Sequence, residues 1–459
     1  MRTLTRYALI STSTLFWAAH ILAQGGANAA PAGSDSLTIT LDEALTRAQK
    51  YSTQIQTANI AVELARQDRR QAKAATLPSV SAFNQFIYTE GNGTPSGVFV
   101  ANDGVHVYNE QLQAHEELLA FIRRGEVRVA EVAAAVAQAR ADVTARGLKA
   151  TVIQNYYAVA AAQRKLANAQ QSSTEAQQFL DITQKQERGG EAAHSDVIKA
   201  QLPVLQRQRD VQDAQLSAAK AKIALAVLIF PSLQVSYAVV DDLAQLPILP
   251  PLAEATAQAN VTSPDLRAAR LSLNQARLSV NVARYAYLPS LGLDVFYGID
   301  ANQFAARTNY ATQATGRSTL PNYLVPYRQN LGYVAQATLT VPLWNWGTTR
   351  SRVQQAALRR QQAELDLTLS QKQLEANLAS YYQEAQTALS QIESLRSSSE
   401  LSAESLRLTT LRYQAGEATA LEVVDAQTTA NAARSAYNDG LVRYRVALAT
   451  LQTLTGFQP

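Results

Sequence analysis

The chain has 459 residues, of which 47% are hydrophobic and 17% charged, with 41 Lys and Arg against 37 Asp and Glu. This near balance argues against a nucleic-acid partner. Cysteine is absent, which excludes disulfides, cysteine-ligated metals, a thiol nucleophile and lipidation on an amino-terminal cysteine.

Residues 1–29 have the pattern of a secretory signal peptide. Arg2 and Arg6 precede an apolar stretch from Tyr7 to Ala23, and Ala27-Asn28-Ala29 follows as a small-x-small cleavage site. A membrane anchor is the alternative, but the apolar run is short and small residues follow it. Beyond this segment no stretch reaches the roughly 18 unbroken apolar residues of a spanning helix. We therefore expect an exported chain that is either soluble in the periplasm or inserted as a β-barrel.

The rest of the chain contains two copies of one unit. The sequence from Leu41 aligns without a gap with the sequence from Leu252, as far as Leu-Pro-Ser at residues 77–79 and 288–290. Farther on, Tyr156-Tyr157 corresponds to Tyr381-Tyr382. The sequence thus predicts a first repeat at 30–230, an inter-repeat equatorial segment at 231–251 and a second repeat at 252–459.

Each repeat is predicted to contain the same elements in the same order. A helix of about 36 residues comes first, rich in good helix formers, and Leu-Pro ends it because proline cannot continue the hydrogen-bond ladder. Two strands, a very long helix, a turn at a glycine and another helix follow. The first helices are expected at Leu41–Thr76 and Leu252–Tyr287, the strands near 79–90, 105–119, 290–300 and 331–344, and the turns near 189–195 and 415–418.

The strands of the second repeat show clear alternation of apolar and small or polar residues. Period two over about ten residues predicts a strand with one apolar face, long enough to cross a bilayer when tilted. Trp344 and Trp346 are predicted to close the last strand as anchors at the membrane interface, where tryptophan is favoured. A strand buried in a sandwich is the alternative. The apolar positions are Leu291, Leu293, Val295, Tyr297 and Ile299, then Leu331, Tyr333, Ala335, Ala337, Leu339, Val341 and Leu343.

The long helix of the second repeat carries heptads. A 3.5-residue apolar period predicts left-handed supercoiling against other helices. From about Thr348 to Gln414 it would run on the order of 100 Å. A fibrous coiled coil is the alternative, and it leaves the paired strands unexplained. The heptad positions are Leu374, Leu378, Tyr381, Ala385, Ala388, Ile392 and Leu395.

Together these parts resemble the TolC-like outer-membrane efflux proteins, the outer membrane factors of tripartite exporters. Three stretches carry the resemblance: LTVPLWNWGTTRSRVQQA (339–356), RYQAGEATALEVVDAQTTANAARSAY (412–437) and the tail LATLQTLTG (448–456). The resemblance implies a mostly α fold with a membrane β-barrel. Three protomers would each give four strands to a shared 12-stranded barrel, and their long antiparallel coiled-coil helices would form a trimeric α-barrel in the periplasm. Four strands alone cannot close a barrel, and open edges are not tolerated in lipid.

The resemblance implies a passive exit duct in the outer membrane, with a long periplasmic extension. The absence of cysteine predicts that this member carries no lipid anchor. Its partners would be a periplasmic adaptor, an inner-membrane pump and outer-membrane lipid. Export of small molecules is the leading interpretation. The alternatives are the exit duct of a type I, ABC-driven protein secretion system and a pore-less structural coiled-coil envelope protein.

Two glycine turns are predicted to form the periplasmic tips where an adaptor docks. Glycine suits the left-handed conformation that ends a helix, which explains Gly190 and Gly416. Acids suit the first turn of the returning helix, where the helix dipole is positive, which explains Glu191 and Glu417.

The resemblance also implies an entrance gate near these tips. Asp196 occupies the family position of an acid that latches the closed entrance, and Tyr413 is retained. Glu422 and Asp425 occupy the family's acidic ring, and rings of carboxylates attract cations in a constriction. The family's latching arginine is replaced by Ala418; Arg188 or Arg412 is the candidate substitute.

No pattern in the sequence predicts catalysis or a cofactor. His106, His115 and His194 lack metal-ligand spacing. Phosphate-binding glycine loops, nucleophile elbows and HExxH motifs are absent from the sequence. We therefore do not expect an enzyme.

Overall fold

The computed structural model describes residues 37–88, 106–233, 236–302 and 331–456. The predicted signal peptide lies outside these residues. So do most of the two segments between paired strands that were expected at 91–104 and 300–330.

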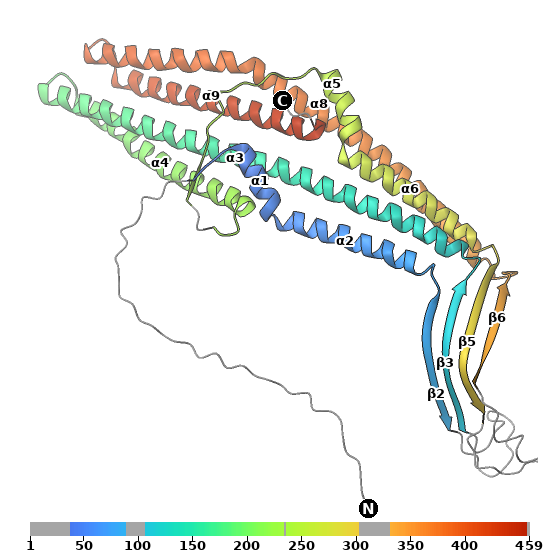
Figure 1. The fold of residues 1–459 in the computed structure, drawn as a ribbon. Coiled ribbons are helices and arrows are strands. Elements are labelled where there is room, and N and C mark those ends of the chain that lie inside the picture. Colours follow the sequence, from blue (N-terminus) through green and yellow to red (C-terminus); the bar gives the residue numbers. More distant parts are fainter. Residues whose placement is uncertain (1–36, 89–105, 234–235, 303–330, 457–459) are drawn as a thin grey trace, which may run out of the picture.

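The molecule is an elongated bundle of helices joined at one end to a four-stranded sheet (Figure 1). The prediction of a mostly helical chain with four antiparallel strands is confirmed. The first repeat contains β1 (Leu37–Ile39), α1 (Leu41–Tyr51), α2 (Thr53–Ala74), β2 (Ser79–Tyr88), β3 (His106–Glu117), α3 (Phe121–Gly189) and α4 (His194–Ile229). The remainder contains β4 (Tyr237–Val239), α5 (Leu252–Thr262), α6 (Pro264–Tyr285), β5 (Ser290–Asn302), β6 (Leu331–Thr340), α8 (Thr348–Gln414) and α9 (Ala420–Thr455).

The first helix of each repeat is broken, and the prediction of a single helix there is wrong. Ser52 separates α1 from α2 with an extended ψ of 122°, and Ser263 separates α5 from α6 with a ψ of 118°. Pro264 explains the second break, because the residue before proline is pushed out of the helical region. The first break has no proline; there α1 packs on α3 and α4, whereas α2 packs mainly along α3.

The heptad positions of α8 form its packed seam. Leu374, Leu378, Ala385, Ala388 and Ile392 are buried, against α9 and α6. A single helix cannot bury its apolar seam alone. The 67 residues of α8 are therefore stabilised by the neighbouring helices along one side and do not enclose a core of their own.

The sheet has the order β2-β3-β5-β6, and every neighbouring pair is antiparallel. Its register gives the sheet one mainly apolar and one mainly polar face. The apolar face carries Val80, Phe86, Leu112, Leu293, Tyr297, Tyr333 and Leu339, together with the polar residues Asn84, Glu110 and Glu116. The polar face carries Ser81, Gln113, His115, Asp294, Gln336 and Thr338, together with the apolar residues Phe83, Phe296 and Val334.

The structure corrects the end of the last strand. β6 ends at Thr340, so Trp344 and Trp346 lie in the segment that leads to α8 and do not close the strand. Pro342 explains the early end, because proline cannot donate to the ladder. The two indoles meet edge to face, with their centroids 5.7 Å apart.

A small parallel sheet at mid-length was not predicted. β1 pairs with β4, which belongs to the inter-repeat segment. The hydroxyl of Tyr156 on α3 donates to the carbonyl of Val240 at 2.9 Å, and Ile39 O lies 3.2 Å away. We call α1, β1, β4, α5 and residues 240–251 the girdle; it packs on α3 and α9.

The helices keep one lateral order along the molecule. Next to the sheet the packing order is α2-α3-α6-α8, and toward the far end it is α4-α3-α9-α8. The edges are therefore α2 with α4 on one side and α8 on the other. They continue the sheet edges β2 and β6.

Candidate functional site

The two tip turns have the same backbone geometry. Gly190 and Gly416 adopt left-handed φ values of 82° and 80°. In each turn the next residue donates its amide hydrogen back across the helix end: Glu191 N lies 2.8 Å from Gln186 O, and Glu417 N lies 2.8 Å from Arg412 O. These backbone bonds satisfy carbonyls that the helix end leaves free.

The acids that follow the glycines lie in the turns and not in the first turns of the returning helices. α4 begins at His194 and α9 at Ala420, so Glu191 and Glu417 precede both helices. Both side chains are exposed. The expected dipole interaction instead applies to Asp196 and Glu422, which do lie in first turns.

Glu422 closes a capping box at the start of α9. Its amide donates to the hydroxyl of Thr419 at 3.3 Å, and its carboxylate accepts from the Thr419 amide at 3.2 Å. The Thr419 amide, and next the Thr419 hydroxyl 3.0 Å from the same carboxylate oxygen, hold the pKa of Glu422 below its usual value, with a smaller contribution from the nearby charge of Arg412. The carboxylate therefore stays charged at neutral pH.

Tyr413 is buried between the two hairpins. Its hydroxyl lies 3.3 Å from the hydroxyl of Thr183 on α3, and its ring meets Phe179 edge to face at 5.1 Å. Gln186 also donates to the Tyr413 carbonyl at 3.3 Å. Tyr413 thus fastens α8 to α3 within one chain.

The predicted latch partners are not brought together in the chain. Asp196 accepts a hydrogen bond from Lys199 at 3.0 Å, one turn along α4. Arg412 donates to the carbonyl of Glu417 at 3.0 Å and so stabilises its own tip. Ala418 packs against the apolar cluster between the tips.

A polar seam between α3 and α9 was missed in the sequence. Gln427 donates to the Glu175 carbonyl at 3.2 Å, and the guanidinium of Arg434 pairs with the Glu175 carboxylate at 2.9 Å. Asn168 donates to Asn431 at 2.9 Å. The sequence does contain a signal for this seam. A spacing of 4, 3, 4, which apolar residues occupy in α8, is occupied in α9 by the polar residues Gln427, Asn431, Arg434 and Asn438. A polar seam holds two helices less tightly than an apolar one, because each hydrogen bond replaces one made with water.

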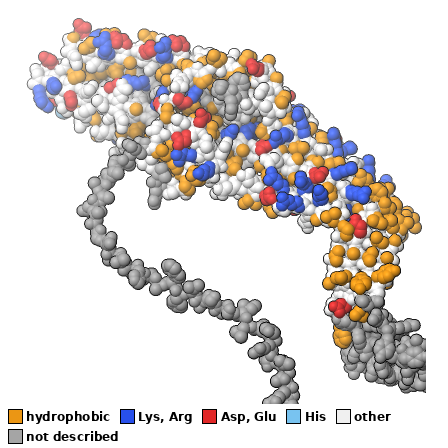
Figure 2. All heavy atoms as spheres, viewed as in Figure 1, with side chains coloured by type: hydrophobic (Ala, Val, Ile, Leu, Met, Phe, Trp, Pro, Cys, Tyr) orange, Lys and Arg blue, Asp and Glu red, His pale blue; other side chains and the backbone are white. Residues whose placement is uncertain are grey.

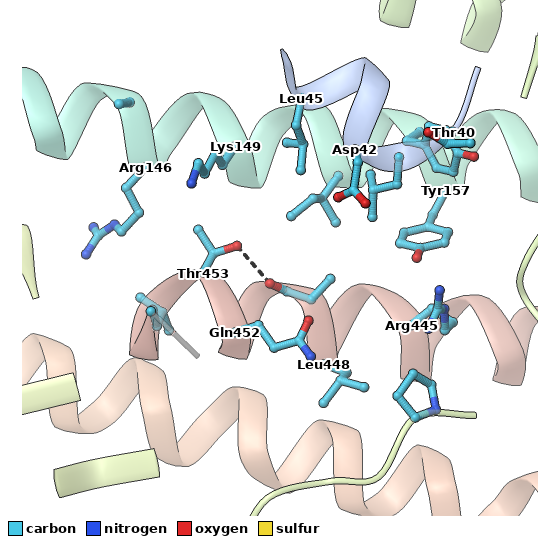
Figure 3. A pocket seen from close by; sticks show the side chains of 18 of the residues that line it. Thr40, Asp42, Leu45, Arg146, Lys149, Tyr157, Arg445, Leu448, Gln452 and Thr453 are labelled. Atoms are coloured by element: carbon cyan, nitrogen blue, oxygen red, sulfur yellow. Dashed lines mark hydrogen bonds between the residues drawn. The ribbon is translucent and has the colours of Figure 1, made fainter. Parts of the chain in front are cut away.

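A cavity of about 830 Å³ lies between the girdle, α3 and α9 (Figure 3). Arg445 on α9 pairs with Asp242 of the girdle and stacks over the Tyr157 ring, its guanidinium carbon 5.3 Å from the centroid. Arg146 and Asp142 of α3 also line the cavity, and they pair with Asp265 and Arg267 at the start of α6. Burial raises the pKa of Tyr156, another lining residue, to about 12, so this phenol stays neutral. The Arg445 pair thus joins α9 to the girdle, and the other two pairs join α3 to α6.

Of the helices in the described part of the chain, none combines the length and apolar character that crossing a bilayer requires. Within the same residues, no three His, Asp or Glu side chains come together as metal ligands.

The family model for outer membrane efflux proteins matches residues 44–229 and 255–457. The chain belongs to this family. The match falls in two parts on either side of the inter-repeat segment, and it confirms the resemblance drawn from the sequence. The efflux protein is therefore a channel of the outer membrane, of the kind that serves tripartite efflux systems, and the family is not one of enzymes.

Solved structures share the fold at low sequence identity. A membrane protein from Pseudomonas aeruginosa is 19% identical with a TM-score of 0.79, covering 91% of this chain and 93% of that one. The outer membrane protein VceC from Vibrio cholerae is 17% identical with a TM-score of 0.76, covering 91% and 96%. The open-state MtrE outer membrane channel from Neisseria gonorrhoeae is 22% identical with a TM-score of 0.73, covering 91% and 88%. No curated protein sequence matches the chain.

Proposed function

We propose that three copies of this chain form the passive exit duct of a tripartite exporter for small molecules. A periplasmic adaptor and an inner-membrane pump would supply the cargo and the energy. The supporting observation is the sheet, whose edges β2 and β6 each pair on one side only among the described residues.

The edges argue for three copies. Open strand edges are not tolerated in lipid, so the sheet must close with other copies. An eight-stranded barrel encloses little more than its own side chains, so two copies would leave no lumen. Three copies give twelve strands. In this arrangement β6 and α8 of one copy lie against β2, α2 and α4 of the next, with the polar face of the sheet toward the lumen.

The tips would serve as docking site and gate. Gly190, Glu191, Gly416 and Glu417 form the exposed turns that an adaptor would meet first. Asp196, Glu422 and Asp425 recur threefold at this end in a trimer, so the mouth would favour cations. Tyr413 would act by holding the two hairpins of each copy together.

At the other end, Trp344 and Trp346 would lie at the membrane interface. Both side chains are exposed, by 76% and 89%, as expected of indoles that meet lipid headgroups. The barrel alone would hold the chain in the membrane, because it has no cysteine for lipid attachment.

The absence of cysteine allows a direct test. A single cysteine at Ala418 would carry a photo-cross-linker in intact cells, with Gln71→Cys, on α2 close to the sheet, as the control position. We expect capture of the adaptor of a proton-driven pump from residue 418 only. Capture of an adaptor for an ABC transporter would instead support protein secretion. Equal capture from both positions, or a purified chain that is monomeric and does not conduct ions, would contradict the duct.

A further inference from the structure

Cations gather on the helix ends that adjoin the sheet (Figure 2). Within about 10 Å of these ends, or roughly seven residues at 1.5 Å each, lie eight exposed cations that make no ion pair among the described residues. We call them the basic collar: Arg69, Arg70, Lys73, Arg124, Arg128, Arg284, Arg350 and Arg352. Arg123 is left out because it pairs with Glu117 at 2.6 Å.

One member of the collar, Arg128, lies on the girdle side of α3. With the 3.5-residue period of packed helices, Arg128 shares one stripe of α3 with Lys149 and Tyr156, which line the cavity beneath the girdle. Glu126 lies two residues before Arg128 and therefore on the opposite side of α3. It shares that stripe with Arg140, which lines a groove between α2, α3 and α6.

Asp68 lies one heptad after Ala61 on α2 and so on the same stripe of that helix. Ala61 lines the groove between α2, α3 and α6. Of the charges placed in this way, Arg128 lies on the girdle face of the wall, and the acids Glu126 and Asp68 lie on the opposite face. In the proposed duct the girdle must lie outside, since it would obstruct the lumen. Arg128 then faces the periplasm, and this step rests on the proposed function.

Three layers follow one another from the sheet to the helices. The sheet has an exposed apolar face, on which Tyr333 is 80% and Val80 71% exposed. An apolar and aromatic belt comes next, including Leu343, at 89% exposed, and Trp344. The collar is third. A membrane has the matching order of hydrocarbon, interface and charged headgroups.

We propose that the basic collar binds the anionic headgroups of phospholipids in the membrane leaflet that faces the periplasm. Guanidinium groups match phosphate oxygens with paired hydrogen bonds. Anionic lipid surfaces attract cations within a Debye length of about 10 Å, and the collar lies within that distance of the sheet. Three copies would place the collar all round the duct and fix its height in the membrane.

Lipid selection by the purified trimer tests the proposal. The full chain would be incubated in detergent with equal amounts of phosphatidylglycerol and phosphatidylethanolamine, and bound lipids counted by native mass spectrometry. The variant Arg70→Gln/Lys73→Gln/Arg124→Gln/Arg284→Gln removes collar charge. The matched control Lys165→Gln/Lys185→Gln/Arg209→Gln/Lys220→Gln removes the same charge from exposed positions of α3 and α4 far from the sheet.

We expect the collar variant to lose at least tenfold of its preference for phosphatidylglycerol, while the control keeps it. No preference in the unaltered trimer, or an equal loss in both variants, would overturn the proposal. So would a collar variant that keeps its lipid preference but loses adaptor cross-linking, since the collar would then bind protein. Single-channel conductance of the same samples tests the duct separately, because it does not depend on lipid selection.

Discussion

The hydroxyl of Tyr413 on α8 lies 3.3 Å from the hydroxyl of Thr183 on α3, and this contact joins the tips of the two hairpins. Thr183 is fully buried and also donates to the carbonyl of Phe179 at 2.9 Å. The hydrogen-bonded chain therefore runs from one hairpin into the backbone of the other. It lies beside the proposed entrance, where the separation of the hairpins would set the width of the mouth.

Tyr413→Phe is expected to loosen this contact. One neutral hydrogen bond contributes about 1 kcal/mol, and the phenyl ring keeps its packing on Phe179. Combined with Asp196→Ala, which removes the partner of Lys199, the change should raise the closed-state leak current in planar bilayers. Unchanged current in the double variant would argue against a latch formed by these residues.

Asp425→Asn should lower the preference of the channel for cations. Asp425 is exposed in the second turn of α9 and makes no ion pair among the described residues, so its charge is available to ions in the mouth. Reversal potentials in a salt gradient would measure the change. Asp439→Asn, farther along the same helix, is the control; an equal effect of both changes would place the selectivity elsewhere.

Glu422 should make the tip sensitive to acid. Its pKa is held low in the fold, so its charge contributes stability above its usual pKa, and the contribution is lost as pH falls through the lowered value. Glu422→Gln can still cap the helix but carries no charge. We expect the variant to melt below the unaltered protein at pH 7 and the two melting temperatures to converge at acidic pH, once the carboxylate is protonated in the fold. Parallel curves at all pH values would show that the charge adds nothing.

Arg445→Ala should destabilise the junction of α9 and the girdle far more than Arg443→Ala. The Arg445 side chain is 11% exposed, and its loss leaves Asp242, 21% exposed, without its cation. Breaking a buried pair costs about 3 kcal/mol or more. Arg443 is 52% exposed in its pair with Glu384, and such surface pairs contribute about 1 kcal/mol or less. Thermal unfolding of the two purified variants would compare them; similar losses would refute the distinction.

Gly416→Ala should weaken the tip turn, whereas Gly147→Ala should not weaken α3. Gly416 has a φ of 80°, which costs an alanine roughly 1 kcal/mol or more. Gly147 lies inside a helix with open space around it, where alanine is favoured by about 1 kcal/mol. Protease cleavage at the tips would report the local effect. Resistance of Gly416→Ala equal to that of the unaltered chain would show that the turn tolerates a side chain.

The long helices, the strands and the tip glycines were predictable because their signals are local. The apolar period along residues 374–392 is a property of one helix, and the break at Gly416 is a property of one residue. The alternation in 291–299 likewise needs no partner to be recognised. These elements, with the motifs around Pro342 and Asp425, were sufficient for the family.

What the sequence by itself determined is thus the kind and order of the elements, the duplication and the family. The tertiary structure decided which distant segments meet. The break at Ser52, the pairing of β1 with β4 and the contact of Tyr413 with Thr183 depend on packing between residues far apart in the chain. The basic collar shows the same limit: the whole chain has a formal net charge of only +4, and only folding brings these cations together at the helix ends beside the sheet. Backbone periodicity is written in neighbouring residues, whereas electrostatic surfaces and buried contacts are sums over the whole fold.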